Sequence, residues 1–226
     1  MRLVFTFHWD DPKGIPHPTR CPYPGCNSTQ VRLRQVVKKL VRDAVCEEVW
    51  AHRYQCLVCG RTFRVYPSGV SRAHTSQRVQ KVALLLYLLG LSYGAVARVL
   101  DALGIYLCKS QVYGVVHSTL AHTQGVRRES LFQRARVSGP SCGMAAVQYG
   151  GRWLSVRLHI HGSRCWTVEV SGLLPDEVQS LRQRVEPLAS IVGAQVRTVG
   201  EGSPIRGPKQ RVKSAICAPL PGGGDL

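Results

Sequence analysis

The chain has few carboxylates for its size. Its 226 residues include 30 Lys and Arg but only 13 Asp and Glu, which gives a formal net charge of +17 and a pI near 10.0. Such an excess of positive charge favours a polyanionic partner, because each phosphate contact releases condensed counterions. Beyond residue 140 the acidic residues are Glu169, Asp176, Glu177, Glu186, Glu201 and Asp225. A site that needs several clustered carboxylates is therefore hard to build in the second half of the chain.

Long hydrophobic runs are also missing. The most apolar stretch, Val82–Gly90, is shorter than the roughly 20 residues that a membrane-spanning helix needs. The first residues contain too short an apolar run for a signal peptide and soon meet Asp10 and Asp11. The cysteines number nine, an odd count that favours a reducing compartment over a disulfide framework. We therefore expect a cytoplasmic, nucleoid-associated protein without a membrane partner.

Four of the cysteines form two knuckles, Cys21-Pro-Tyr-Pro-Gly-Cys26 and Cys56-Leu-Val-Cys59. Each knuckle can present two thiolates to one ion from a tight turn. The residues between Cys26 and Cys56 are enough for a small strand-rich excursion that brings the pairs together. Four sulfur ligands at this spacing predict a tetrahedral Zn²⁺ site, with all four positions filled and a role in folding rather than catalysis.

Changes in periodicity predict a multidomain α+β protein. Residues 1–70 are turn-rich, with short alternating stretches typical of half-exposed strands, and predict a zinc ribbon. Residues 71–130 change to a helical period and predict a three-helix, helix-turn-helix DNA-binding domain. Residues 131–142 read as a linker, and the basic tail at 201–226 reads as disordered.

Residues 143–200 predict three strands, a helix and a fourth strand. The strands are expected at 143–148, 153–159, 165–170 and 195–199, and the helix from Pro175 to about Ile191. In this stretch Glu169 is expected to be a strand residue without a partner. His159 and His161 share one face of their strand, and a satisfied or solvent-facing histidine pair is a better interpretation than a second metal site with Cys165.

The helical region contains the candidate DNA-binding residues. Helices are expected up to Leu89, from Tyr93 to Leu103 after the N-cap Ser92, and from Gln111 to about His122 with Ser110 as its N-cap. Polar and basic residues then lie at the start and outer face of the third helix, where base edges or phosphates would be met. The proposed contacts to double-stranded DNA are Lys109, Ser110, Gln111, Tyr113 and His117, with Arg127 and Arg128 on phosphates.

These motifs together resemble a known family. The knuckle Cys21–Cys26, the run from Cys56 to Pro67, the segment Leu91–Leu100 and the strand-strand-strand-helix-strand order are similar to bacterial insertion-sequence transposases of the DDE type. The resemblance implies that the ribbon and the helix-turn-helix bind the terminal inverted repeats of the element. It also implies a C-terminal RNase H-like domain that cuts and joins strands with two divalent metals held by three acidic residues.

The acidic residues of that family have no clear counterparts in this chain. The first Asp position is occupied by Gln148 or Tyr149, and the second by Gly200 or by Glu201, a weak catalytic candidate. The third acid would come on a later helix, and the chain ends at Leu226. We therefore expect a partial RNase H-like domain and a catalytically inactive remnant.

Two alternatives stay open at this point. In one, Glu201 and carboxylates supplied from elsewhere still bind Mg²⁺, and the protein is an active strand-transfer transposase. In the other, the DNA-binding half serves as a transcriptional regulator. A homodimer is a further option for the assembly.

Overall fold

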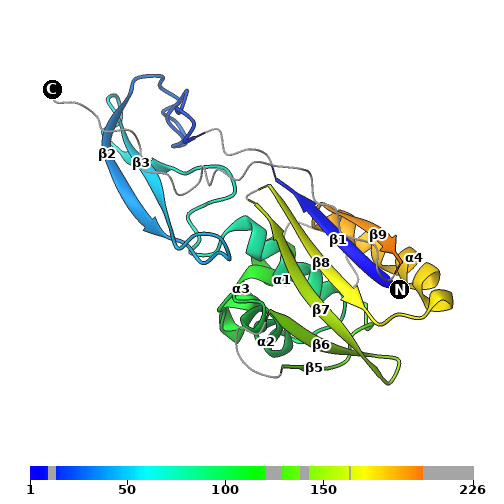
Figure 1. Cartoon of the computed structure of the whole chain (residues 1–226). Coiled ribbons are helices and arrows are strands. Elements are labelled where there is room, and N and C mark those ends of the chain that lie inside the picture. Colours follow the sequence, from blue (N-terminus) through cyan, green and yellow to red (C-terminus); the bar gives the residue numbers. More distant parts are fainter. Residues whose placement is uncertain (10–13, 121–128, 138–142, 163, 201–226) are drawn as a thin grey trace. The chain divides into compact units, whose positions relative to one another are not determined.

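The computed structural model describes residues 1–9, 14–120, 129–137, 143–162 and 164–200 (Figure 1). The described residues form four helices and two antiparallel sheets, which confirms the α+β class. They divide into two compact units: residues 14–77 make up the smaller one, and residues 1–9 with those described from 78 to 200 make up the larger one. None of the described helices has the length and apolar character that crossing a membrane requires.

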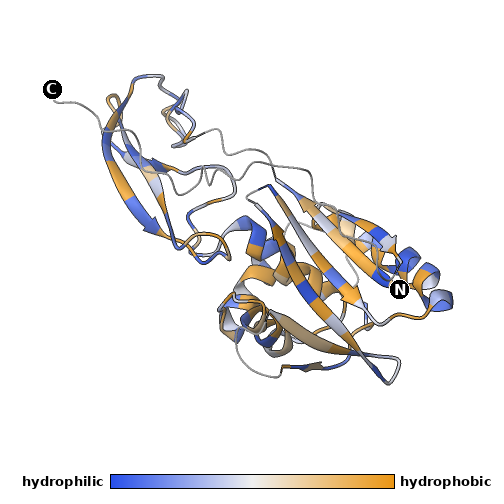
Figure 2. Cartoon of the chain, viewed as in Figure 1, coloured by the Kyte–Doolittle hydropathy of each residue, from blue (hydrophilic) through white to orange (hydrophobic). Residues whose placement is uncertain are grey.

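The smaller unit is built on a three-stranded sheet. Strands β2 (Val31–Leu40), β3 (Glu48–Cys56) and β4 (Thr62–Val65) pair in the order β2-β3-β4. Apolar and polar residues are mixed along both strands (Figure 2); most of β2 is exposed, whereas buried residues recur along β3 at Val49, Ala51, Tyr54 and Cys56. Val41, Cys46 and Val49 form a small buried cluster, and Val70 packs against it.

The larger unit begins its helical part with the three predicted helices. They are α1 (Gln77–Leu88), α2 (Tyr93–Ala102) and α3 (Lys109–Leu120). The side chain of Ser92 accepts a hydrogen bond from the Ala95 N–H at 3.3 Å, which confirms it as the N-cap of α2. Ser110 is not the cap of α3, because that helix already begins at Lys109.

A six-stranded antiparallel sheet forms the rest of the larger unit. Its strands are β5 (Ala135–Arg136), β6 (Met144–Tyr149), β7 (Arg152–His161), β8 (Cys165–Ser171), β1 (Arg2–His8) and β9 (Ala194–Val199), in that spatial order. Helix α4 (Pro175–Ile191) connects β8 to β9 and continues through Pro187. The four strands and the helix expected from residues 143–200 are thus confirmed.

The N-terminal strand corrects the expected domain boundary. The sequence pattern predicts one ribbon domain over residues 1–70, but β1 lies between β8 and β9 and pairs with both. The reason is burial: Leu3, Phe5 and Phe7 are almost completely inaccessible within this sheet. Because β8 and β9 are not neighbours, residues 143–200 cannot form the sheet without the first residues of the chain.

Two further boundaries differ from expectation. The three helices belong to the same compact unit as the six-stranded sheet, not to a domain of their own. Leu131 and Phe132, expected to begin a linker, are 3% and 2% exposed. Their segment packs directly on Gly90, where the backbone has φ +117° and an added Cβ would lie 2.9 Å from the carbonyl oxygens of Glu129 and Phe132. Glycine is therefore required at Gly90 both for its conformation and for this close approach.

The helices cover one face of the large sheet (Figure 1). Helix α2 packs on β5 and β6, whereas α4 packs on β9 and β1. On the same face the Arg78 guanidinium of α1 lies 5.0 Å from the ring centroid of Trp166, which is fully buried. The opposite face carries the alternate residues of each strand and is largely polar.

We predict that Gly90→Ala destabilises the protein by about 1–3 kcal/mol more than Gly104→Ala. Both glycines have positive φ, but a Cβ at Gly104 meets no atom within 4 Å. The difference between the unfolding free energies of the two variants therefore measures the effect of the close contact between residue 90 and the segment 129–132. Urea unfolding followed by circular dichroism gives both values, and equal costs would show that this segment does not pack on Gly90.

Candidate metal centre and nucleic-acid interface

The two cysteine knuckles lie at the ends of the small sheet. Cys21 and Cys26 precede β2, while Cys56 ends β3 and Cys59 lies in the turn before β4. Each turn is closed by a backbone hydrogen bond, from Cys26 N–H to the Tyr23 carbonyl at 3.2 Å and from Gly60 N–H to the Cys56 carbonyl at 3.0 Å. The sheet thus supplies a rigid base on which both turns face each other.

The four sulfur atoms meet in one cluster. Cys21 Sγ lies 3.8 Å from Cys59 Sγ, and Cys26 Sγ lies 3.6 Å from Cys56 Sγ. All four sulfurs lie within 4.8 Å of one another. A tetrahedral ion with metal–sulfur bonds of about 2.3 Å needs sulfurs about 3.8 Å apart, so the cluster has the size of such a site. The predicted grouping of Cys21, Cys26, Cys56 and Cys59 is confirmed, and it can hold one metal ion.

The surroundings give the thiols different acidities. Backbone N–H donors of Cys59 and Val58 lower the pKa of the Cys56 thiol to about 6, although burial acts against them. Burial raises the pKa of the Cys21 thiol to about 12. In the metal-free protein Cys56 is therefore a thiolate at neutral pH, whereas Cys21 keeps its proton until a metal displaces it.

Helix α3 presents a stripe of exposed polar side chains. Lys109, Tyr113 and His117 follow one another at intervals of four residues and are all exposed, as is Ser110. The adjacent side of the helix is anchored by Val112 and Val116, which are almost fully buried. The stripe therefore lies on a helix whose position is fixed by its apolar face.

Gln111 has a different role from its neighbours. Its side-chain Oε1 accepts a hydrogen bond from the Cys108 N–H at 3.0 Å, while the Gln111 and Val112 N–H groups donate to the Cys108 carbonyl. Cys108 thus takes the N-cap position of α3. The Gln111 side chain accepts from the backbone N–H of Cys108, as the residue at the third helical position does in a capping box. The half-buried Gln111 amide is already bonded within the protein.

The stripe continues into a cluster of stacked rings that the sequence did not predict. The rings of Tyr87 and Tyr93, from α1 and α2, stack at a centroid distance of 4.9 Å. Tyr113 meets Tyr93 edge-on at 5.4 Å, and His117 lies 4.0 Å from Tyr113. Side chains from three helices meet here, so no pattern within a single helix could reveal the cluster. It fixes Tyr113 and His117 in a defined orientation.

Some candidate residues lie outside the described part of the chain. These are Arg127 and Arg128, proposed for phosphate contacts, and Glu201, the weak catalytic candidate. Of the positions compared with the acids of the family, Gln148 and Tyr149 lie near the end of β6, and Gly200 follows β9.

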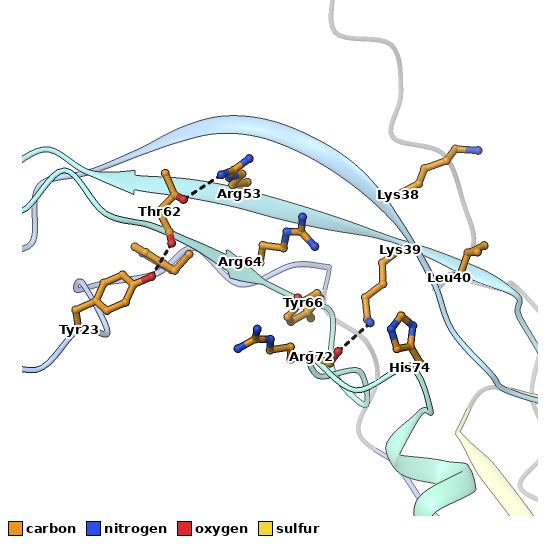
Figure 3. A pocket seen from close by; sticks show the side chains of 11 residues that line it. Tyr23, Lys38, Lys39, Leu40, Arg53, Thr62, Arg64, Tyr66, Arg72 and His74 are labelled. Carbon is orange, nitrogen blue, oxygen red and sulfur yellow. Dashed lines mark hydrogen bonds between the residues drawn. The ribbon is translucent and has the colours of Figure 1, made fainter. Parts of the chain in front are cut away.

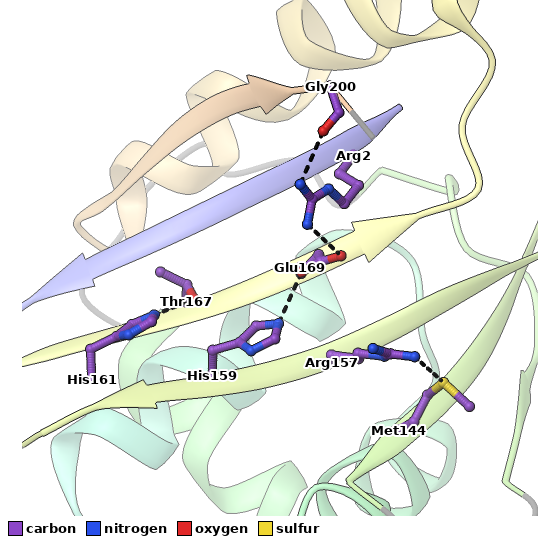
Figure 4. A network of polar contacts seen from close by, with 8 residues as sticks. All are labelled: Arg2, Met144, Arg157, His159, His161, Thr167, Glu169 and Gly200. Atoms are coloured by element: carbon purple, nitrogen blue, oxygen red, sulfur yellow. Dashed lines mark hydrogen bonds and ion pairs between the residues drawn. The ribbon is translucent and has the colours of Figure 1, made fainter. Parts of the chain in front are cut away.

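The buried carboxylate of Glu169 has partners, contrary to expectation. On the polar face of the large sheet it lies 2.9 Å from His159 Nε2 and 3.6 Å from Arg2 Nη1 (Figure 4). Arg2 could not be foreseen as a partner because it comes from β1, expected in another domain. His161 also has a partner, Thr167 Oγ1 at 3.3 Å, which confirms the interpretation of both histidines as satisfied.

Three further carboxylates of the larger unit, Glu129, Glu177 and Glu186, are also paired with arginines. Glu177 accepts from the Leu174 N–H at 3.1 Å and pairs with Arg152, and this hydrogen bond to Arg152 holds the pKa of Glu177 below its usual value. Within the described residues, the four cysteines are the sole group of three or more His, Cys, Asp or Glu side chains placed to share a metal ion. An acidic triad is not assembled from these residues.

We predict that metal affinity falls as the pH is lowered, and that the fall steepens below about pH 6. Above that pH the metal must displace protons from thiols such as Cys21, and below it Cys56 also becomes protonated. Competition with a chelator of known pH dependence measures this. An affinity that is constant between about pH 5 and about pH 8 would contradict the assignment of these thiols as ligands.

Comparison of the chain with protein-family models, with curated proteins and with solved structures finds no match in any of the three.

Proposed function

We propose that the protein is a zinc-dependent double-stranded DNA-binding protein that recognises the terminal inverted repeats of an insertion sequence. The observation that carries the proposal is the exposed stripe of Lys109, Tyr113 and His117 on the well-anchored helix α3. A helix held in this way can enter a major groove and present side chains to base edges and phosphates.

Charge supports this assignment of α3. Lys109 lies in the first turn, which contains no acidic residue, at the end where the helix dipole favours an anion. Helix α2, capped by Ser92, packs against α3, which supports the proposal that the two helices act as a helix-turn-helix. The net charge of the whole chain, +17, also favours binding to a polyanion such as DNA.

The metal in this proposal is Zn²⁺. Four thiolates with the spacing of a tetrahedron favour zinc over the hard cations, which prefer oxygen ligands. With all four positions taken by sulfur, the ion has no open position for a substrate. Its role is to join the two knuckles and so to stabilise the fold of the smaller unit.

In this proposal the protein does not cut DNA itself. Support comes from the carboxylates: Glu169 pairs with Arg2 and contacts His159, and Glu177 pairs with Arg152. The positions where the family has its first acids are Gln148 or Tyr149 and Gly200, with Glu201 as the nearby carboxylate. Metal-dependent nicking of a terminal-repeat duplex, lost in Glu201→Ala, would overturn this part of the proposal.

We predict that the protein binds one zinc ion and that Cys59→Ser lowers the affinity for zinc by a hundredfold or more. Cys59 is exposed, so its replacement removes a ligand without creating a cavity. Cys108→Ser, outside the cluster, is the control and keeps full zinc content. Elemental analysis and zinc titration distinguish the two, and zinc binding unaffected by Cys59→Ser would refute the site.

We predict that Lys109→Gln weakens binding to a short duplex and lowers the slope of log affinity against log salt by about 1. The control is Arg197→Gln, which removes the same charge from an exposed side chain of β9. Fluorescence anisotropy over a salt series measures both variants. If Lys109→Gln and Arg197→Gln have equal effects, α3 is not the contact surface, and absence of duplex binding at low salt would refute the function.

A further inference from the structure

The small sheet carries a pocket lined with cations. It has a volume of about 810 Å³ and lies wholly within the unit of residues 14–77 (Figure 3). We call it the basic pocket and define it by Lys39, Arg53, Arg64, Tyr66, Arg72 and His74. Lys38 also lines it but already has a carboxylate partner, Glu48, at 2.7 Å. The lining residues include no Asp or Glu.

Two arginines face each other across adjacent strands at this pocket. Arg53 of β3 and Arg64 of β4 are direct Cα partners, so both side chains project from the same face of the sheet. Like charges directly opposite each other on paired strands destabilise a sheet. Arg53 donates to Thr62 Oγ1 at 3.2 Å, which is a neutral acceptor. Within the part of the chain that the structure describes, no ion pair joins Arg53, Arg64 or Arg72 to a carboxylate.

The floor of the pocket contains a buried lysine. Lys39 is only 9% exposed, and its Nζ donates to the Arg72 carbonyl at 3.2 Å and lies 5.5 Å from the centroid of the Tyr66 ring. Burial, followed by the charge of Arg64, lowers the pKa of Lys39. Burying an ammonium group without a carboxylate is costly unless an anion compensates it. The pocket therefore gathers Lys39, Arg53, Arg64 and Arg72 without a carboxylate among its lining residues.

We propose that the basic pocket is a phosphate-binding site, which takes phosphate groups of a nucleic-acid backbone through Arg53, Arg64 and Arg72 above Lys39. Guanidinium groups bind phosphate oxygens in a bidentate manner, and a lysine contributes a point charge below them. The proposal rests on the proposed DNA-binding function for the source of the phosphates, and it adds a contact surface separate from helix α3.

The pocket is linked to the metal site through its wall. Tyr23, between the ligands Cys21 and Cys26, lines the pocket and donates from its hydroxyl to the Thr62 carbonyl at 2.7 Å (Figure 3). Arg61 lies 5.2 Å from the centroid of the same ring. Removing the metal frees the first knuckle and with it Tyr23, so phosphate binding at the pocket is expected to depend on the metal.

The test compares two double variants of the full-length, zinc-loaded protein. Arg64→Gln with Arg72→Gln removes two exposed arginines of the pocket, and Arg32→Gln with Arg34→Gln removes two exposed arginines of β2 that do not line it. One probe is a short labelled DNA duplex over a salt series. The other is tripolyphosphate, followed by NMR shifts of the Lys39 and arginine side chains. Zinc content checks that each variant is folded.

The pocket variant is expected to lower the salt slope for the duplex by about 2 and to lose tripolyphosphate binding, whereas the β2 variant keeps both. Tripolyphosphate binding without duplex binding would support the pocket while refuting the proposed DNA function. Duplex binding that depends on Lys109 but is equal in both double variants would refute the pocket and leave that function intact. Failure of both probes to shift the pocket residues would also overturn the proposal.

Discussion

The larger unit depends on the pairing of its first strand. Strand β1 lies between β8 and β9 and is hydrogen-bonded to both, so these strands share a sheet only because the N-terminus joins them. Its alternate residues fill the core through Leu3, Phe5 and Phe7 and, on the other face, bring Arg2 to Glu169. A buried carboxylate without that arginine would be costly, so strand pairing and charge neutralisation depend on the same segment.

The smaller unit depends on a different constraint, the approach of its two cysteine turns. The buried apolar residues described in this unit are few: Cys21, Val41, Cys46, Val49, Ala51, Tyr54 and Cys56. A bound ion can compensate for a small core because its binding free energy becomes folding free energy.

Local patterns predicted most of the elements, and long-range pairings were the part that they missed. The knuckle spacing identified all four cysteines, and helical periodicity with Ser92 located α2, because each signal lies within a few residues. The position of β1 was missed because the alternation of apolar and polar residues in a strand indicates which of its faces is buried. It does not indicate which strands pair with it. The same reason explains why the ring cluster of Tyr87, Tyr93 and Tyr113 was not foreseen, as each ring comes from a different helix.

The scarcity of carboxylates has a consequence for function. Two acids of the larger unit pair with arginines: Glu169 with Arg2, and Glu177 with Arg152. Each of these carboxylates is thereby compensated within the protein. Among the residues that the structure describes, no carboxylate pairs with Lys109 of α3 or with the arginines of the basic pocket. The proposed contact with a phosphate backbone requires such a distribution, because phosphates are bound by cations that are not already compensated within the protein.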